Sequence, residues 1–310
     1  MNAHECKELL SSDAARVPNR REFLALSGVL LLVGCSNDPK GPTASGAVDT
    51  SPPKTSANGF TIAQRFSQEV LVPGLVRLPI SLATNQAVLS DGPDALRATI
   101  YDTVSGQPVL KGLRAQKRRV SAGYVYWDFH AQLDNPGTYA LVVDGGTPDG
   151  GAIQINKPSL VTIPVPGQAL PPFDTPTTDN NRGVDPLCTR IVGGPCPFHA
   201  LTLTQALQTG KPVAYLIGTP AHCQFGTCGP GLEFLMAAAT KLGDQITIVH
   251  AEVYVDDSAT VTTPAVNEYN LTFEPTLYLV NRAGIIANRL DAAWDQSELN
   301  EALVELMSAS

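Results

Sequence analysis

Residues 212–231 read PVAYLIGTPAHCQFGTCGPG, and this stretch sets the fold that we expect for the last third of the chain. It opens on a continuous apolar run at 212–217, which is typical of a β-strand buried on both faces. A loop with two cysteines follows, and residues 231–242 then have the apolar spacing of a helix that ends at Gly243. A strand, a loop and a helix in this order predict the start of an α/β domain.

The sequence on either side continues the alternation of strands and helices. Thr202 and Gln205 have the spacing of a capping box that opens a short helix, and Pro264 suits the first position of another. The remaining predicted elements are a buried strand at 246–254, a hairpin of strands at 276–280 and 285–289, and a last helix, capped by Asp295 and Glu298, whose Leu299, Leu303 and Leu306 face inward. Together these elements predict an α/β sandwich.

The order of these elements resembles the thioredoxin fold over residues 187–310. Pro275, in the run FEPT at 273–276, resembles the cis-proline of that family, which sits beside the active cysteines. The resemblance implies that Glu274 and Pro275 belong to the substrate groove. TPAHC at 219–223 and CGP at 228–230 are similar to a branch of thioredoxin-like bacterial lipoproteins. Membership would imply thiol–disulfide exchange on protein substrates, with no organic cofactor and with a separate redox partner that resets the pair.

The cysteine pair departs from the thioredoxin motif. Gly231 stands where the C-G-P-C motif has its second cysteine, so the partner available to Cys228 is Cys223, a C-x4-C spacing. Residues 212–217 also contain no acidic residue, although thioredoxins keep a buried carboxylate there. The source of proton transfer during exchange is therefore left open.

The position of Cys228 predicts that it is the nucleophile. Gly229 and Pro230 suit an N-cap and a first helical position, which places Cys228 just ahead of a helix. The unpaired N–H groups and the dipole at a helix N-terminus lower a thiol pKa, whereas a carboxylate such as that of Glu274 opposes this. Cys223, in the loop, is the predicted resolving cysteine.

A non-catalytic alternative remains open at this point. The longer loop between Cys223 and Cys228 is also compatible with a static disulfide on a fold that has lost its activity. Cys188 and Cys196 flank the run GGP at 193–195, with no helix terminus to activate them, so we predict a structural disulfide there. The chain would then be an envelope interaction protein with two structural disulfides.

A third reading is a copper-binding chaperone of thioredoxin fold. Cys196 and His199 form a C-x2-H pair, and His222 lies next to Cys223. Copper-binding relatives use a tighter cysteine spacing and a downstream histidine. His250 falls in a predicted buried strand, and the sequence after it contains no further histidine. We therefore predict no metal site.

The N-terminal segment has the marks of an export signal. Residues 19–24 read NRREFL, which resembles the twin-arginine motif, and a short apolar run then leads to LVGC at 32–35, which resembles a lipobox. We expect a signal peptide at 1–34, lipidation of Cys35 and a flexible tether at 35–58. The protein would be anchored to a membrane of the cell envelope, in an oxidising, extracytoplasmic space.

The middle of the chain predicts short strands punctuated by turns. Expected strands are 76–83, 96–101, 109–113, 124–133, 138–143 and 160–164. The run DNPGTY at 134–139 resembles the corner of immunoglobulin-like domains, where a tyrosine hydroxyl bonds back to the backbone. We predict an immunoglobulin-like β-sandwich at 59–165, a linker at 166–186 and the thioredoxin-like domain at 187–310.

Composition limits the remaining possibilities. A chain of 310 residues suits two domains of roughly 150 residues each. The formal net charge of −8 argues against a nucleic-acid partner, which needs a basic face. The 26 glycines and 25 prolines, with only 16% charged residues, favour short strands and many turns.

Overall fold

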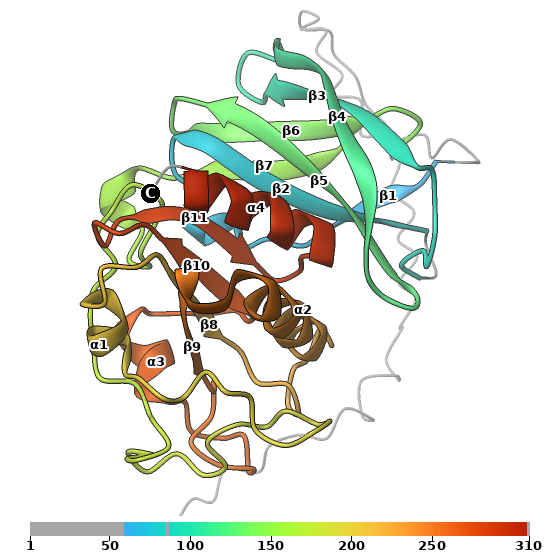
Figure 1. Ribbon diagram of the computed structural model, residues 1–310. Helices are drawn as coiled ribbons and strands as arrows, with labels where there is room; N and C mark the ends of the chain where they lie inside the picture. Colours follow the sequence, from blue (N-terminus) through green and yellow to red (C-terminus); the bar gives the residue numbers. More distant parts are fainter. Residues whose placement is uncertain (1–58, 85–86, 309–310) are drawn as a thin grey trace, which may run out of the picture. The chain divides into compact units, whose positions relative to one another are not determined.

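Antiparallel strands make up the first half of the computed structural model, which describes residues 59–84 and 87–308 (Figure 1). Alternating apolar side chains of these strands face a common core that includes Trp127, Phe129 and Leu141. The strands are β1 (Thr61–Gln64), β2 (Gly74–Ala83), β3 (Ala95–Asp102), β4 (Pro108–Ser121), β5 (Tyr124–Leu133), β6 (Gly137–Val143) and β7 (Gly151–Ile155). Short 3-10 turns lie at Gln68–Val70 and Pro158–Leu160.

The seven strands form one nearly closed sheet in the order β1-β2-β5-β4-β3-β6-β7. The long strand β4 pairs with β3 along its first part and with β5 along its last part. The Gln64 side-chain amide of β1 donates to the Ala152 carbonyl of β7, which brings the two end strands together. The predicted corner is confirmed, because the Tyr139 hydroxyl donates to the Asn135 carbonyl at 2.9 Å. The assignment to the immunoglobulin-like class stays a prediction.

In the first half, one predicted strand is wrong and two strands were not predicted. The expected strand at 160–164 is wrong, because Pro158–Leu160 is a 3-10 turn and irregular chain follows it. The strand that completes the sheet is instead β7, and β1 was not predicted either. Both strands are only four or five residues long and stand at the ends of the sheet, so neither carries a strong apolar pattern.

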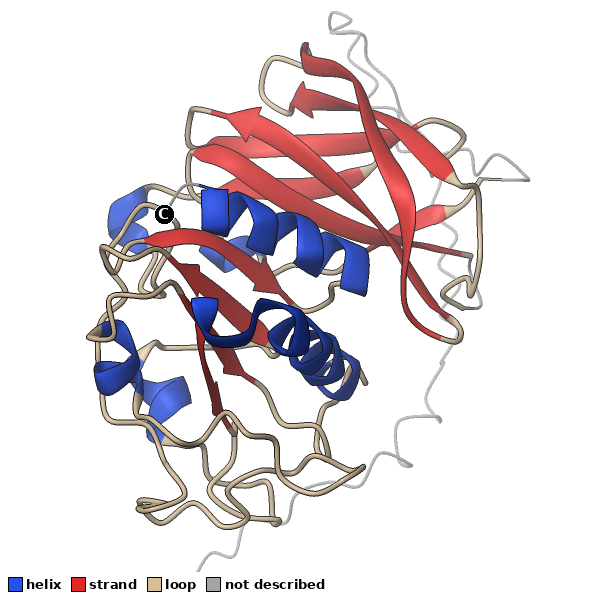
Figure 2. Cartoon of the chain, in the orientation of Figure 1, coloured by secondary structure: helices blue, strands red, loops and turns tan. Residues whose placement is uncertain are grey.

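The second half of the described chain has a four-stranded sheet covered by helices (Figure 2). Its strand order is β11-β10-β8-β9, with β8 and β9 parallel and β10 antiparallel to its neighbours. This topology agrees with the predicted thioredoxin-like fold. Its elements are α1 (Leu203–Leu207), β8 (Val213–Ile217), α2 (Cys228–Leu242), a 3-10 turn (Gly243–Gln245), β9 (Thr247–Ala251), α3 (Pro264–Glu268), β10 (Thr276–Val280), β11 (Ile286–Asp291) and α4 (Gln296–Ser308).

Each face of this sheet packs against its own pair of helices. Along β8, Tyr215 faces the core shared with α1 and α3, whereas Leu216 faces the core shared with α2 and α4. The strand is buried along its whole length, as its continuous apolar run predicts. The capping box of Thr202 and Gln205 is confirmed at the start of α1.

Polar contacts connect the β-strand half to the α/β half. Arg77 of β2 forms a buried ion pair with Glu298 of α4, and the Tyr126 hydroxyl also donates to Glu298. The side chain of Glu298 therefore binds Arg77 and Tyr126 and does not cap α4. The cap is Asp295, whose carboxylate accepts the Glu298 backbone N–H. The segment predicted as a linker, 166–186, also packs on the α/β half: Gly167 and Gln168 exchange backbone hydrogen bonds with Ile286.

The predicted signal peptide, the lipidated Cys35 and the tether lie outside the described residues. Among the helices that the structure does describe, none has the length and apolar character needed to cross a bilayer.

Candidate functional site: a cysteine pair at a helix start

Cys223 and Cys228 form a disulfide at the N-terminal end of α2, with their Cα atoms 6.0 Å apart. The helix begins at Cys228 itself and has Thr227 as its N-cap, two residues earlier than the N-cap predicted at Gly229. The Thr227 hydroxyl donates to the Ala292 carbonyl at 2.6 Å, which holds the cysteine loop against the chain that follows β11. The two cysteines expected to act together are thus brought together.

The two sulfur atoms differ in their surroundings. Cys228 is 1% exposed, whereas Cys223 is partly exposed. The backbone N–H of Cys228 donates to the Cys223 sulfur at 3.3 Å. Hydrogen bonds from the N–H groups of a helix start stabilise negative charge on the sulfur that accepts them. The helix N-terminus, expected from the sequence to stabilise a thiolate at Cys228, therefore also stabilises negative charge on the Cys223 sulfur.

The strand-entry proline lies beside the pair. The Glu274–Pro275 peptide bond is cis, as the resemblance predicts. Gly218, which follows β8, approaches this point so closely that an added Cβ would lie 3.2 Å from the Pro275 Cβ and 3.7 Å from the Cys228 sulfur. A Cβ at position 218 would therefore be tight against Pro275 and in ordinary van der Waals contact with the Cys228 sulfur.

Glu274 supplies the carboxyl group that β8 lacks. Its Oε2 lies 3.5 Å from the Cys228 sulfur and accepts the Thr219 backbone N–H at 3.1 Å. Burial raises the pKa of Glu274 to about 7; the Thr219 hydrogen bond opposes this shift, and nearby Glu252 adds to it. From the sequence, Glu274 was expected in the substrate groove and as a charge that opposes the thiolate, not as a proton donor or acceptor. A group that titrates near neutrality next to a reacting sulfur can also give and take a proton.

The structure also explains the missing second cysteine. A Cβ at Gly231 would lie 2.8 Å from Cζ2 of Trp294, which is 1% exposed. Such a distance is well inside ordinary van der Waals contact, so only glycine fits between α2 and this indole. The C-G-P-C position is closed here by packing, which leaves Cys223 as the partner in the loop.

A shallow apolar depression borders the cysteine loop. It has a volume of about 180 Å³ and is lined by Phe225, Tyr254, Val266, Phe273 and Glu274, among others. Phe225 lies between the two cysteines in sequence and is 51% exposed. The depression therefore brings exposed aromatic surface next to the disulfide.

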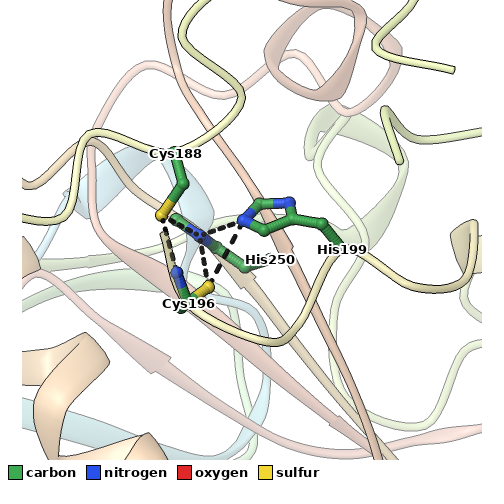
Figure 3. A group of neighbouring side chains, drawn as sticks. All are labelled: Cys188, Cys196, His199 and His250. Carbon is green, nitrogen blue, oxygen red and sulfur yellow. Dashed lines mark hydrogen bonds between the residues drawn. The ribbon is translucent and has the colours of Figure 1, made fainter. Parts of the chain in front are cut away.

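The second pair of cysteines does not form the predicted bridge. Cys188 and Cys196 are both free and buried. Their sulfurs face imidazoles instead: Cys196 lies 3.3 Å from His199 Nε2 and 3.4 Å from His250 Nδ1, and Cys188 lies 3.8 Å from His250 Nδ1. These four side chains, shown in Figure 3, are called the buried Cys/His cluster below.

Two features of the sequence point to this cluster, but neither shows that its four side chains meet in space. The C-x2-H pair of Cys196 and His199 is visible in the sequence, and so is a histidine in a buried strand. His222, the other histidine considered for copper, is not in the cluster: its Nε2 lies 3.5 Å from an Asp257 carboxylate oxygen. The structure therefore keeps Cys196 and His199 from the set considered for copper, and replaces His222 and Cys223 with Cys188 and His250.

Comparison with protein-family models and with curated proteins gives no match. Two solved structures from Chlorobium tepidum are similar over 46% of this chain. One is described as a thiol:disulfide interchange protein DsbE, with 13% identity, a TM-score of 0.34 and 99% of its own chain covered. The other is a thiol:disulfide interchange protein of the thioredoxin family, with 11% identity, a TM-score of 0.32 and 98% of its own chain covered. At these scores, the function proposed below rests on the geometry of this chain.

Proposed function

We propose that this protein exchanges thiols and disulfides with protein substrates through Cys223 and Cys228. The observation that carries the proposal is the asymmetry of this disulfide: one sulfur is partly exposed and accepts a helix N-terminal N–H, and the other is buried beside a carboxyl group that titrates near neutrality. A purely structural bridge needs neither feature. Enzymes commonly tune the pKa of such groups where chemistry occurs.

The geometry favours Cys223 as the sulfur that meets a client, which reverses the roles predicted from the sequence. A client thiolate attacks the Cys223 sulfur, because the Cys228 sulfur is covered. The bond between Cys223 and Cys228 breaks, a client–Cys223 mixed disulfide forms, and Cys228 leaves with the electron pair. A second client thiolate then displaces Cys223, so the client loses two electrons and the cysteine pair gains them. The reverse sequence reduces a client disulfide.

Glu274 handles the proton in this scheme. When Cys228 leaves as a thiolate, protonated Glu274 donates its proton to that sulfur across the 3.5 Å that separates them. When Cys228 attacks the mixed disulfide in the reverse direction, ionised Glu274 accepts the thiol proton. A pKa of about 7 leaves both forms populated at neutral pH.

The depression beside the loop is the proposed contact surface for the client. Phe225 and the aromatic side chains across the depression offer apolar contact to an extended segment that carries the reacting cysteine. Contacts of this kind hold the segment while the mixed disulfide forms.

The location of this chemistry is part of the proposal. The twin-arginine-like motif, the lipobox and Cys35 support an exported protein held on the cell envelope by its lipid. A separate redox protein would reset the cysteine pair after each turnover. The β-strand half, for which we propose the immunoglobulin-like class, would serve as a spacer or interaction module.

Reduction of insulin in the presence of dithiothreitol, followed as turbidity, tests the proposal. The wild-type chain should accelerate precipitation, and Cys223→Ser and Cys228→Ser should each abolish the acceleration. The matched control is wild-type protein that has been reduced and then blocked with N-ethylmaleimide before the assay.

The alternative of a non-catalytic interaction protein makes the opposite prediction. In that case the Cys223–Cys228 bond resists dithiothreitol until the chain is denatured, and no variant changes the turbidity. Mass measurement after alkylation, with and without mild reductant, separates the two outcomes.

A further inference from the structure

The buried Cys/His cluster brings together four possible metal ligands from two distant parts of the chain. Cys188, Cys196 and His199 come from the segment before α1, and His250 comes from β9. One ligand atom from each lies within 4.8 Å of all the others. All four residues are buried, with at most 7% exposed.

The distances fit a tetrahedron around a zinc ion. Zn–S bonds of about 2.3 Å and Zn–N bonds of about 2.0–2.1 Å imply S···N separations of about 3.6 Å and an N···N separation of about 3.3 Å. Three of the four S···N separations in the cluster are 3.3, 3.4 and 3.8 Å. The two ring nitrogens, His199 Nε2 and His250 Nδ1, lie 3.3 Å apart.

Outer contacts orient two of the four ligands, His250 and Cys188, whereas the buried Nδ1 of His199 has no hydrogen-bond partner among the described residues. The Nε2 of His250 lies 2.9 Å from the Gly218 carbonyl, which can only accept, so this nitrogen carries the hydrogen. In the neutral imidazole, His250 Nδ1 therefore turns a lone pair toward the sulfurs. Metal-bound histidines characteristically donate their other N–H in this way. The backbone N–H of Cys196 also donates to the Cys188 sulfur at 3.4 Å.

Charge explains why a cation suits this site. Two thiolates buried without a counter-charge would be costly, whereas two thiolates, two neutral imidazoles and one Zn²⁺ sum to zero. Two sulfur and two nitrogen ligands in tetrahedral arrangement are typical of zinc. With four protein ligands the site is closed to substrate, which is the pattern of structural rather than catalytic zinc.

We propose that the buried Cys/His cluster is a structural Zn²⁺ site that fastens the segment before α1 to β9. Other bonds along the same path support this role: the His250 backbone N–H donates to the Phe198 carbonyl at 3.0 Å, and the Thr189 backbone N–H donates to buried Glu252 at 2.6 Å. The site is separate from the Cys223–Cys228 pair, so the zinc proposal and the exchange proposal can each fail alone.

Metal analysis of the purified full chain tests the assignment. We expect about one zinc per chain in the wild type and in the matched control Cys223→Ser/Cys228→Ser, and none in Cys188→Ser/Cys196→Ser. His199→Gln should lose the metal, whereas His222→Gln should keep it. Zinc that persists in the Cys188→Ser/Cys196→Ser variant would overturn the assignment.

A second set of measurements uses only the wild-type chain, in case a ligand variant does not fold. After chelator treatment, added Zn²⁺ should raise Tm by about 5–10 °C at a hundredfold excess over Kd. Added Co²⁺ should give the intense visible bands of a tetrahedral thiolate complex. A Cys188–Cys196 disulfide found by peptide mass, bound copper in place of zinc, or a Co²⁺ spectrum without thiolate bands would each overturn the proposal.

Discussion

Replacing Glu274 with glutamine removes the proposed proton donor while keeping its size. In the wild type, the carboxyl group is neutral below its pKa of about 7 and negative above it. A negative charge 3.5 Å from the Cys228 sulfur opposes the thiolate that develops there as the disulfide is reduced. The rate of reduction, corrected for the ionisation of the attacking thiol, should therefore fall as pH rises through about 7.

The size of this effect follows from Coulomb's law at that distance. Two unit charges 3.5 Å apart repel by about 1.2 kcal/mol in bulk water and by about 5 kcal/mol at an effective dielectric constant of about 20. If about half of the charge has developed in the transition state, these limits correspond to falls of about threefold and about 50-fold. Because the site opens to solvent on the Cys223 side, we expect a value nearer the lower limit.

The assay is reduction of the Cys223–Cys228 bond by dithiothreitol, quenched with iodoacetamide and read by mass between about pH 5.5 and about pH 8.5. Glu274→Gln should show a nearly flat corrected rate, lower than the wild-type rate at acid pH and equal to or above it at alkaline pH. The exposed Glu268→Gln is the matched control and should keep the wild-type profile. A flat wild-type profile, or the same midpoint in Glu274→Gln, would refute a role for this carboxyl group.

Three further predictions concern exposure, packing and buried charge. In the reduced native protein, iodoacetamide should label Cys223 at least about tenfold faster than Cys228, as read by peptide mass, because only the first sulfur is partly exposed. Gly231→Cys should not create a working C-G-P-C pair and should destabilise the fold by about 1–3 kcal/mol, measured by urea unfolding, because the new side chain would overlap a buried indole. Glu298→Ala should cost about 3–5 kcal/mol in the same measurement, because it leaves Arg77, whose side chain is only 12% exposed, without its carboxylate partner.

The two stability predictions each have a matched control variant in the same chain. Arg119→Ala breaks only an exposed ion pair with Asp91 and should change stability by less than about 1 kcal/mol, in contrast to Glu298→Ala. Gly229→Ala, two residues earlier, should be tolerated where Gly231→Cys is not, because a Cβ added at Gly229 meets no atom within 4 Å in the described part of the chain. Faster labelling of Cys228 than of Cys223 would restore the roles predicted from the sequence.

Local sequence patterns were enough to predict most of the strands and helices of the α/β half. The apolar run before the cysteine loop became β8, and the helix after it became α2, because strand burial and helix amphipathicity repeat over a few residues. Cys223 and Cys228 are only five positions apart, so their pairing was within reach of sequence reasoning. The short end strands β1 and β7 were missed because they are defined by their partners rather than by their own composition.

By itself, the sequence determined the order of strands and helices in the α/β half and the closeness of Cys223 to Cys228, because these depend on neighbours along the chain. The place of Pro275 beside the pair was expected only from the family resemblance. The tertiary structure alone decided which sulfur is covered, that Trp294 closes the position of Gly231, and that Cys188 faces His250, 62 positions away, rather than a disulfide partner. Exposure, steric room and ligand geometry are set by contacts between segments far apart in the chain, and no local spacing encodes them.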